Sequence, residues 1–421
     1  MVAALGSYID THKDQFPWLV TPQSWAQNVM AIVGSDVIRA DHVTVIEIDD
    51  TMYDNRKLSG PTDRRFVASL VRAAVRASAA VVVLDLDLTR ENADATVRKP
   101  QNDELLRAIL EAQARTPPVP VVLAVLLHDD SGRFVEQPNA IPDSAIPYAR
   151  FGNPGLPNRP LVGFVNAPSE PGQLPLIVTA RPAGRSDDVP FWSLSLRAAD
   201  AYDSVGHIEP AATLEPAVQA ATAHGEFVYA GFLSPDHFRH VSADLVANEL
   251  REALDLLAYR IAIIGGHRHN KHGGWVDQHE SPIGTMPGVY LHANRIEAIL
   301  GRRLKRPSPW WLPWLVDLTL GTFLVVLSVR VRSLSKKLAY FAVFAVLPFC
   351  CAYFAAVNAR YALDFVLPTF LLSGHFVHDA VTERRHGGRK KRRAAKATPS
   401  AASASPADAP LESRRSAPPL S

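Results

Sequence analysis

The chain has 421 residues and a formal net charge of +2, but its charge is distributed unevenly. Residues 1–300 carry 25 Lys/Arg and 36 Asp/Glu, a net charge of −11, whereas residues 384–421 carry ten basic and two acidic residues, a net charge of +8. Nucleic-acid affinity comes largely from Lys and Arg that neutralise phosphates, so this acidic region excludes a nucleic-acid partner. Both cysteines, Cys350 and Cys351, lie outside it, so it has no thiol for a disulfide.

Short β-rich runs alternate with amphipathic stretches over the first 300 residues. This alternation predicts an α/β fold with a mostly parallel sheet and helices on both faces. The expected strands are 43–48, 80–86, 119–127, 226–232 and 260–265, with a hairpin formed by 161–165 and 176–179. The expected helices are 62–77, with Thr62 as its N-cap, and 103–114, 191–202, 243–257 and 288–300. Sequence rich in Pro and Gly at 138–160 predicts a long loop.

Three apolar runs follow this region, at residues 311–329, 338–357 and 361–379. The second run holds twenty residues without a charge. At about 1.5 Å per residue, a helix of that length covers the roughly 30 Å hydrocarbon core of a bilayer. The sequence therefore predicts three transmembrane helices in a multi-pass protein of the plasma (inner) membrane. The tail after them, residues 384–421, is expected to be disordered and to contact anionic membrane lipid.

Basic residues flank the predicted spans unevenly, and this asymmetry predicts the orientation. Four of them lie between the first two spans, and a run from Arg389 to Arg393 follows the third, so both segments are expected in the cytoplasm. Residues 1–300 would then lie outside it, with the sensor domain at residues 41–300; a basic cluster at residues 302–306 opposes this orientation but is outnumbered. Residues 1–40 show no export signal, so we expect a transmembrane helix upstream of Met1 or an unusual export route.

One stretch near the end of the α/β region reads Ser281-Pro-Ile-Gly-Thr-Met-Pro-Gly-Val-Tyr-Leu-His292-Ala. It resembles the T-P-x-G-x-x-P-G-V-x-x-H-A block of the type-two CHASE family, the cyclase/histidine-kinase-associated sensory extracellular domains, with Ser281 replacing Thr. In that family the block follows a strand ending in an I-G pair and a loop with Asp. Further matches are Ile264-Gly265, Asp277, Ile46-Glu-Ile-Asp49-Asp50, Pro61 to Arg65 and Val83-Leu-Asp85.

The resemblance covers roughly residues 40–300 and implies a bacterial, extracytoplasmic sensor domain that binds a small-molecule ligand. Family members often continue into a cyclase or a kinase, whereas a short basic tail follows the predicted spans here. We therefore expect no enzyme activity and no cofactor. The signal is expected to pass through the membrane helices to a separate signalling protein, and the sensor is expected to act as a homodimer.

Acidic residues follow the predicted strands: Asp49, Asp50, Asp85 and Asp87. Because the carboxyl ends of neighbouring parallel strands form the usual crevice of such sheets, these residues are candidates for a ligand or cation pocket. The alternative is that they cap the loops and helices that follow them.

The start of the last predicted helix supplies further candidates, Pro287, Gly288 and His292, which would face the same pocket. Their structural interpretation is a Pro-Gly turn into the helix, with His292 and Asn294 bonded to nearby loop carbonyls.

Two further hypotheses concern chemistry. Asp85-Leu-Asp87-Leu-Thr89 matches the nucleophile motif of haloacid-dehalogenase-type phosphatases, in which both carboxylates hold magnesium, but the other parts of that site are not visible. The alternatives to a sensor are therefore an extracytoplasmic phosphatase and a structural envelope protein.

The densest histidine cluster predicts either a metal site or a mobile solvated loop. Its members are His267, His269, His272 and His279, with Asp277 and Glu280 beside them.

Overall fold

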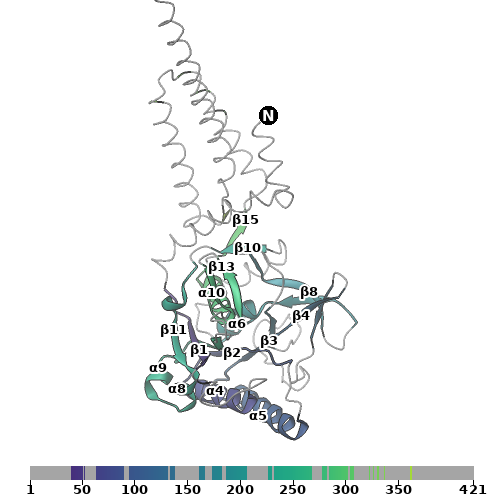
Figure 1. Ribbon diagram of the computed structural model, residues 1–421, viewed down its shortest axis with the longest axis vertical. Coiled ribbons are helices and arrows are strands. Elements are labelled where there is room, and N and C mark those ends of the chain that lie inside the picture. The colour runs from purple at the N-terminus through teal and green to yellow at the C-terminus, as the bar shows by residue number, and fades with distance from the viewer. Residues whose placement is uncertain are drawn as a thin grey trace, which may run out of the picture.

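The computed structural model describes the α/β region in segments: residues 39–50, 52, 63–89, 94–130, 133–137, 161–165, 173–182, 186–205, 226–229, 232–267, 277–281, 284–301 and 304–307, with isolated positions beyond. Its centre is a six-stranded sheet with the order β11-β1-β12-β2-β3-β6 (Figure 1). Every pairing in this sheet is parallel. The strands are β1 (Val43–Asp49), β2 (Val81–Asp85), β3 (Val121–Val125), β6 (Val162–Phe164), β11 (Arg239–Ser242) and β12 (Ile261–His267).

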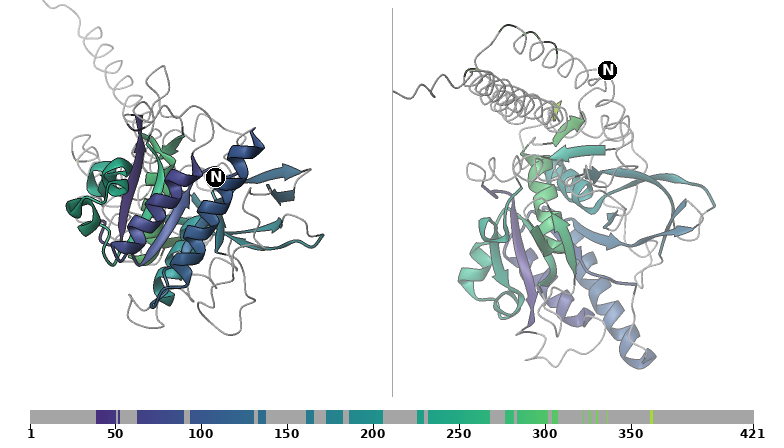
Figure 2. Two further views of the ribbon diagram at one scale, coloured as in Figure 1. Left: turned by 90° about the horizontal axis from the view of Figure 1, so that it is seen from below. Right: turned by 45° about the horizontal axis from the view of Figure 1, so that its top comes forward.

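Helices cover both faces of this sheet, as the sequence predicted. On one face α4 (Arg64–Arg76) lies beside α5 (Ala95–Gln113), and α4 also contacts α8 (Ala243–Ala247) (Figure 2). On the other face α6 (Leu194–Ser204) packs against α10 (Gly288–Leu300). Two separate clusters of buried apolar side chains fill the two interfaces, which confirms the predicted α/β class.

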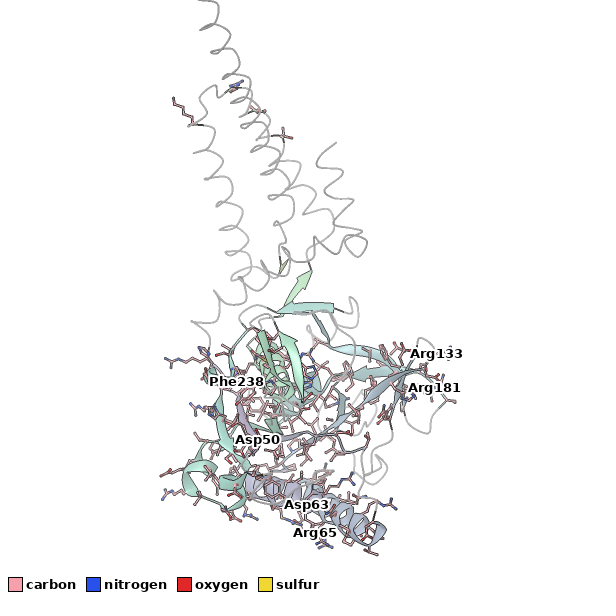
Figure 3. All side chains as sticks on the ribbon, viewed as in Figure 1. Asp50, Asp63, Arg65, Arg133, Arg181 and Phe238 are labelled. Atoms are coloured by element: carbon pink, nitrogen blue, oxygen red, sulfur yellow. The ribbon has the colours of Figure 1, made fainter. Side chains whose placement is uncertain are left out.

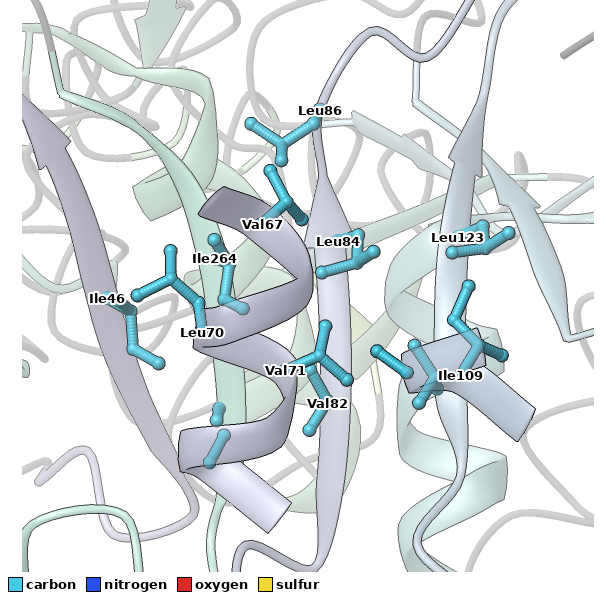
Figure 4. Close-up of a cluster of buried hydrophobic side chains, with 14 of the residues drawn as sticks. Ile46, Val67, Leu70, Val71, Val82, Leu84, Leu86, Ile109, Leu123 and Ile264 are labelled. Carbon is cyan, nitrogen blue, oxygen red and sulfur yellow. The ribbon is translucent and has the colours of Figure 1, made fainter. Parts of the chain in front are cut away.

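The interface between α4 and the sheet shows how the apolar pattern produces this packing (Figure 4). Leu70 and Val71 of α4 are fully buried, and they face strand residues such as Val82, Leu84 and Ile264, which are also fully buried. Burying one such side chain contributes roughly 1.5–3 kcal/mol. The central strands are apolar on both faces because each face is covered by helices, which is typical of parallel sheets.

Three smaller sheets surround the central one. One consists of β4 (Leu127–Asp130), β5 (Arg133–Glu136), β8 (Ile177–Arg181) and β9 (Val189–Trp192), with Arg133 and Arg181 near its outer end (Figure 3). Another consists of β7 (Gln173–Pro175), β10 (Glu226–Tyr229), β15 (Leu304–Pro307) and β16 (Tyr361–Ala362). The third is the hairpin of β13 (Gln278–Ser281) and β14 (Gly284–Pro287), which leads into α10.

Strand pairing differs from the sequence predictions in three places. The predicted hairpin of 161–165 with 176–179 is wrong, because β6 pairs in parallel with β3 while β8 belongs to another sheet. The strand predicted at 226–232 exists as β10, but it pairs antiparallel with β7 and β15 outside the central sheet. The edge strand β11 was not predicted. These differences arise because strand partners are chosen by contacts far apart in the chain.

Helix boundaries differ for local reasons. The N-cap of α4 is Asp63, whose carboxylate accepts the Arg65 N–H, in place of Thr62. Helix α5 begins eight residues earlier than expected, capped by Asp94, and it contains Pro100. The helix predicted at 243–257 is two short helices, α8 and α9 (Arg251–Asp255), because Glu249 between them has a φ of 54°.

One helix start and one strand end also moved. Residues Phe191 and Trp192, expected at the start of a helix, belong to β9, so α6 begins at Leu194. The strand predicted at 119–127 ends at Val125, and Leu127 begins β4.

Several predictions lie outside the described residues: the lead-in before residue 39, the loop at 138–160, the tail, and nearly all of the three apolar runs. Among the helices that the structure does describe, none is both long enough and apolar enough to cross a bilayer. At the start of the third run, Tyr361 and Ala362 pair with β15 as a short strand and do not open a helix.

Candidate functional site

The chain connections diverge around the carboxyl end of β12, and we call the region between this strand end and the start of α10 the crevice. This strand lies between β1 and β2. Strands β1 and β2 lead to α4 and α5 on one face, whereas β12 leads through β13 and β14 to α10 on the opposite face. In open α/β sheets, ligands bind outside the carboxyl ends of strands at the point where neighbouring connections diverge in this way.

Two glycines allow α10 to begin close to the end of β12. A Cβ atom on Gly265 would lie 2.6 Å from Val289 Cγ2, at the first turn of α10. A Cβ atom on Gly288 would collide with the Asp277 carboxylate, and the Gly288 N–H donates to the Asp277 carbonyl oxygen at 3.0 Å. The predicted turn into the helix at Pro287 and Gly288 is present, with Pro287 at the N-cap.

Asp85, at the carboxyl end of β2, lies beneath this crevice beside Gly265. Its side chain is only 9% exposed, and its Oδ2 atom is buried without a hydrogen-bond partner among the described residues. Burial raises the pKa of Asp85 to about 7; the negative charge of Asp277 adds to this shift, while His279 and Arg295 oppose it. The dominant cause is the loss of water around the charged form of the carboxyl.

His292, on the second turn of α10, connects Asp85 with α6. Its Nδ1 atom lies 3.3 Å from the Ser195 hydroxyl, and its Nε2 atom lies 3.9 Å from Asp85 Oδ1. The second distance is too long for a hydrogen bond. Burial lowers the pKa of His292 well below its usual value, and Arg295 and His279 lower it further, so the imidazole is neutral near pH 7.

The order Ser195, His292, Asp85 resembles the sequence of groups in a hydrolase triad, but Ser195 is completely buried in the core. A hydroxyl in that position cannot reach a substrate, so Ser195 contacts His292 between α6 and α10 without acting as a nucleophile. Sequence reasoning missed Ser195. The available signal was a serine between Leu194 and Leu196, at the buried start of an amphipathic helix.

Asp277 and His279 lie at the mouth of the crevice, where their side chains are 57% and 43% exposed. The His279 Nε2 atom is 2.7 Å from Asp277 Oδ1, and this hydrogen bond raises the pKa of His279. Arg295, one turn beyond His292 on α10, is buried near the same groups. The crevice therefore combines exposed charges at its mouth with a buried carboxyl beneath them.

The other predicted aspartates make local contacts. Asp49 accepts the Met52 N–H at 2.8 Å and the Ser242 hydroxyl at 3.4 Å. Asp87 accepts the Thr89 N–H at 3.0 Å. Asp50 follows Asp49 at the end of β1 and is half-buried (Figure 3). For Asp49 and Asp87 these contacts agree with the capping interpretation, and a ligand-binding role for all three residues stays a prediction.

The metal hypothesis is only partly covered by the structure. His267 ends β12 and His279 lies in β13, while His269 and His272 fall outside the described residues. Within the described part of the chain, no group of three or more His, Cys, Asp or Glu side chains is arranged to hold a metal ion. A metal site that includes His269 and His272 stays a prediction.

Arg64 lies in the stretch Pro61 to Arg65 that matched the family, at the first residue of α4. The side chain is 3% exposed, and its Nη2 atom donates to the Leu88 carbonyl oxygen at 2.9 Å. Its Nη1 atom donates to the Asn102 side chain on α5. Arg64 thus fixes the loop that follows Asp85 and Asp87 against α4 and α5.

Helix α10 is buried along its whole length, and its polar side chains Asn294 and Glu297 bond to segments far away in the chain. Asn294 accepts the Leu233 N–H at 2.7 Å and donates to the Leu233 carbonyl at 2.8 Å. One turn further on, Glu297 accepts the backbone N–H groups of His42 and Val43 at 2.7 and 2.9 Å. The predicted bond of Asn294 to a loop carbonyl is confirmed.

Comparison with known families agrees with this architecture. The family model described as CHASE2 domain matches residues 16–330, which is most of the chain. A search of curated proteins found no match, and a search of solved structures also found none. The chain therefore belongs to the CHASE2 domain family, a family of extracellular sensory domains.

Proposed function

We propose that this protein is a membrane-anchored sensor whose domain at residues 41–300 lies outside the cytoplasm. It binds a small stimulus in the crevice at the end of β12 and relays the signal through its membrane helices to a separate partner protein. Membership of an extracellular sensory family supports this proposal. So do the three apolar runs that follow the domain and the basic residues between and after them.

The position of α10, between the crevice and the start of β1, is the main support for this function. Its first residue lies at the crevice, where Gly288 contacts Asp277. Its last turn carries Glu297, bonded to the start of β1, and the chain then continues through β15 toward the predicted spans. A stimulus that shifts the start of α10 therefore acts on one rigid, buried element with contacts at both ends.

The phosphatase alternative is disfavoured by the environment of its proposed nucleophile. Asp85 is buried and its pKa is raised to about 7, whereas a magnesium-binding nucleophile must be ionised and reachable by the substrate. Asp87 instead accepts a hydrogen bond from the loop that follows it. A purely structural envelope protein is the remaining alternative, and it requires no response of α10 to any stimulus.

Epitope tags in the full chain test the orientation. One tag is inserted in the segment 138–160 and a second after Ser400, and each is probed with protease in intact spheroplasts and after lysis. We expect the first tag to be cleaved in intact spheroplasts and the second only after lysis. Protection of the first tag before lysis contradicts an extracytoplasmic domain. Chemical crosslinking of the same membranes tests the proposed homodimer.

A further inference from the structure

The carboxyl group of Asp85 lacks the partners that a buried charge requires. Oδ2 has no hydrogen-bond partner among the described residues, and the polar atom paired with Oδ1, His292 Nε2, is 3.9 Å away. Leaving a buried polar atom unpaired is unfavourable, and it is more unfavourable for an ionised group. Proton uptake removes the charge. The geometry therefore makes this carboxyl a binding site for a proton.

The charged and polar groups near Asp85 come from α10, from the segment that forms β13 and, through His292, from α6. Helix α10 contributes His292 and Arg295, and the segment that forms β13 contributes Asp277 and His279. Helix α6 contributes Ser195 through its contact with His292, and β12 contributes Gly265, which has no side chain. Burial outweighs the two cationic neighbours, so the pKa of Asp85 is raised to about 7.

Building on the proposed sensory function, we propose that the stimulus bound in this crevice is the proton, that Asp85 binds it, and that α10 responds to its release.

Proton release changes which hydrogen bonds the three polar groups can make. With Asp85 protonated, His292 Nδ1–H donates to Ser195 and the serine hydroxyl donates to the His292 carbonyl oxygen, 3.5 Å away, while Nε2 stays 3.9 Å from the neutral carboxyl. With Asp85 ionised, the other tautomer is favoured: Ser195 donates to Nδ1 and Nε2–H donates to the carboxylate. The Asp85 O–H bond breaks, and its proton leaves to solvent past Asp277 and His279. The tautomer change breaks the Nδ1–H bond and forms the Nε2–H bond, so the imidazole keeps one proton while the Ser195 hydroxyl turns from the His292 carbonyl oxygen to Nδ1.

The second arrangement requires movement of α10. Nε2 and Oδ1 are 3.9 Å apart, and a hydrogen bond brings such atoms to about 2.9 Å. His292 must therefore approach β2 by about 1 Å. Asn294 and Glu297 lie on the same helix and hold Leu233 and the start of β1, so this shift reaches both segments. Ionisation of Asp85 is thereby coupled to the end of the domain from which the chain leaves.

Hydrogen exchange of the full chain in lipid nanodiscs tests the proposal. Protection factors of peptides from α10 are measured between about pH 5 and pH 9, which brackets the pKa of Asp85 near 7. We expect one transition in the wild type with a midpoint near 7. Asp85→Asn is expected to abolish it and to keep the low-pH protection at every pH.

Asp277→Asn is the matched control, because it makes the same chemical change at the exposed mouth of the crevice. It is expected to retain the transition with a lower midpoint, since the Asp277 charge raises the pKa of Asp85. Infrared spectroscopy of the wild type gives a second readout that does not depend on any variant folding. The band of a protonated carboxylic acid is expected to disappear with the same midpoint as the exchange transition.

Three results overturn the proton site: a wild type without a transition in α10, a transition that survives Asp85→Asn, or no protonated carboxyl band at low pH. A small molecule that stabilises the domain equally at all pH values, with no such transition, also overturns it but leaves the sensory function standing. Conversely, a cytoplasmic location of the tag at 138–160 overturns the sensory function. In that case the hydrogen-exchange transition in α10 of the purified protein still supports the proton site.

Discussion

Glu297 and His42 meet across 255 positions of the chain, at the end of α10 and the start of β1. One carboxylate oxygen accepts the backbone N–H groups of His42 and Val43, and the other lies 2.9 Å from His42 Nδ1. Glu297 is buried, so these three donors replace the water that its charge would otherwise need. The pair therefore joins the two segments through which the chain enters and leaves the domain.

Replacing Glu297 with Gln should destabilise the domain. The amide keeps the shape of the side chain but removes the charge, and it directs N–H groups at backbone donors. Hydrogen bonds to charged groups contribute about 1.5–3 kcal/mol, so we expect a loss of that size in the free energy of unfolding, measured with urea. Glu249→Gln is the matched control. Its ion pair with Arg76 is exposed, and exposed pairs contribute about 0–1 kcal/mol.

The stability of the domain should fall as pH rises toward 8. Asp85 has a folded pKa of about 7, above its unfolded value, so the folded state binds the proton more tightly. Its contribution is fully present below the unfolded pKa of about 3.9 and is lost as pH rises through 7, with a total on the order of 4 kcal/mol. Urea unfolding at a series of pH values measures this loss.

Asp85→Asn should flatten that part of the pH profile and raise stability at pH 8 relative to the wild type. Unchanged pH dependence in this variant would show that another group is responsible.

Two adjacent glycines should respond differently to the same substitution. A Cβ atom on Gly265 meets Val289 at 2.6 Å, whereas one on Gly266 meets no atom within 4 Å. Gly265→Ala should therefore destabilise the domain by about 1–3 kcal/mol through overpacking at the start of α10. Gly266→Ala should be neutral or stabilise it by up to about 1 kcal/mol, because the unfolded chain loses freedom. Thermal unfolding of both variants tests the difference, and equal effects contradict the proposed close approach.

Arg64→Lys should loosen the loop after β2. A lysine cannot reproduce the two separate hydrogen bonds that the guanidinium donates to Leu88 and Asn102. We expect a loss of about 1–3 kcal/mol and faster proteolysis within residues 86–94. The neighbouring exposed arginine provides the control, because Arg65→Lys should change neither quantity. Identical behaviour of the two variants would contradict the structural role of Arg64.

Much of the secondary structure could be read from local pattern. Helix α10 has the predicted bounds, Gly288–Leu300, because a Pro-Gly turn starts it and Gly301 follows it. Strands β1, β2 and β12 were found from short apolar runs, since strands covered on both faces need apolar side chains at every position. Helix α5 was misplaced because Pro100 normally argues against a helix interior, yet here it is tolerated after an Asp94 cap.

The candidate site could be anticipated only in outline. Parallel sheets generally bind ligands outside the carboxyl ends of their strands, and this rule predicted that Asp85 and the start of α10 lie at one crevice. The contact of Ser195 with His292 joins helices 97 positions apart, and no local pattern encodes that distance. Asp85 likewise lies beside Gly265 and faces His292, residues that are far from it in the chain and meet it only in the folded protein.

By itself, the sequence determined the family, the α/β class and the apolar runs that predict membrane spans, because these depend on composition and on side-chain periodicity along the chain. Only the tertiary structure decided that β12 lies between β1 and β2, that Asp85 is buried with an unpaired oxygen, and that α10 is bonded to the start of β1. The physical reason is that strand order and burial depend on contacts between distant segments, while periodicity records only which face of each element is covered.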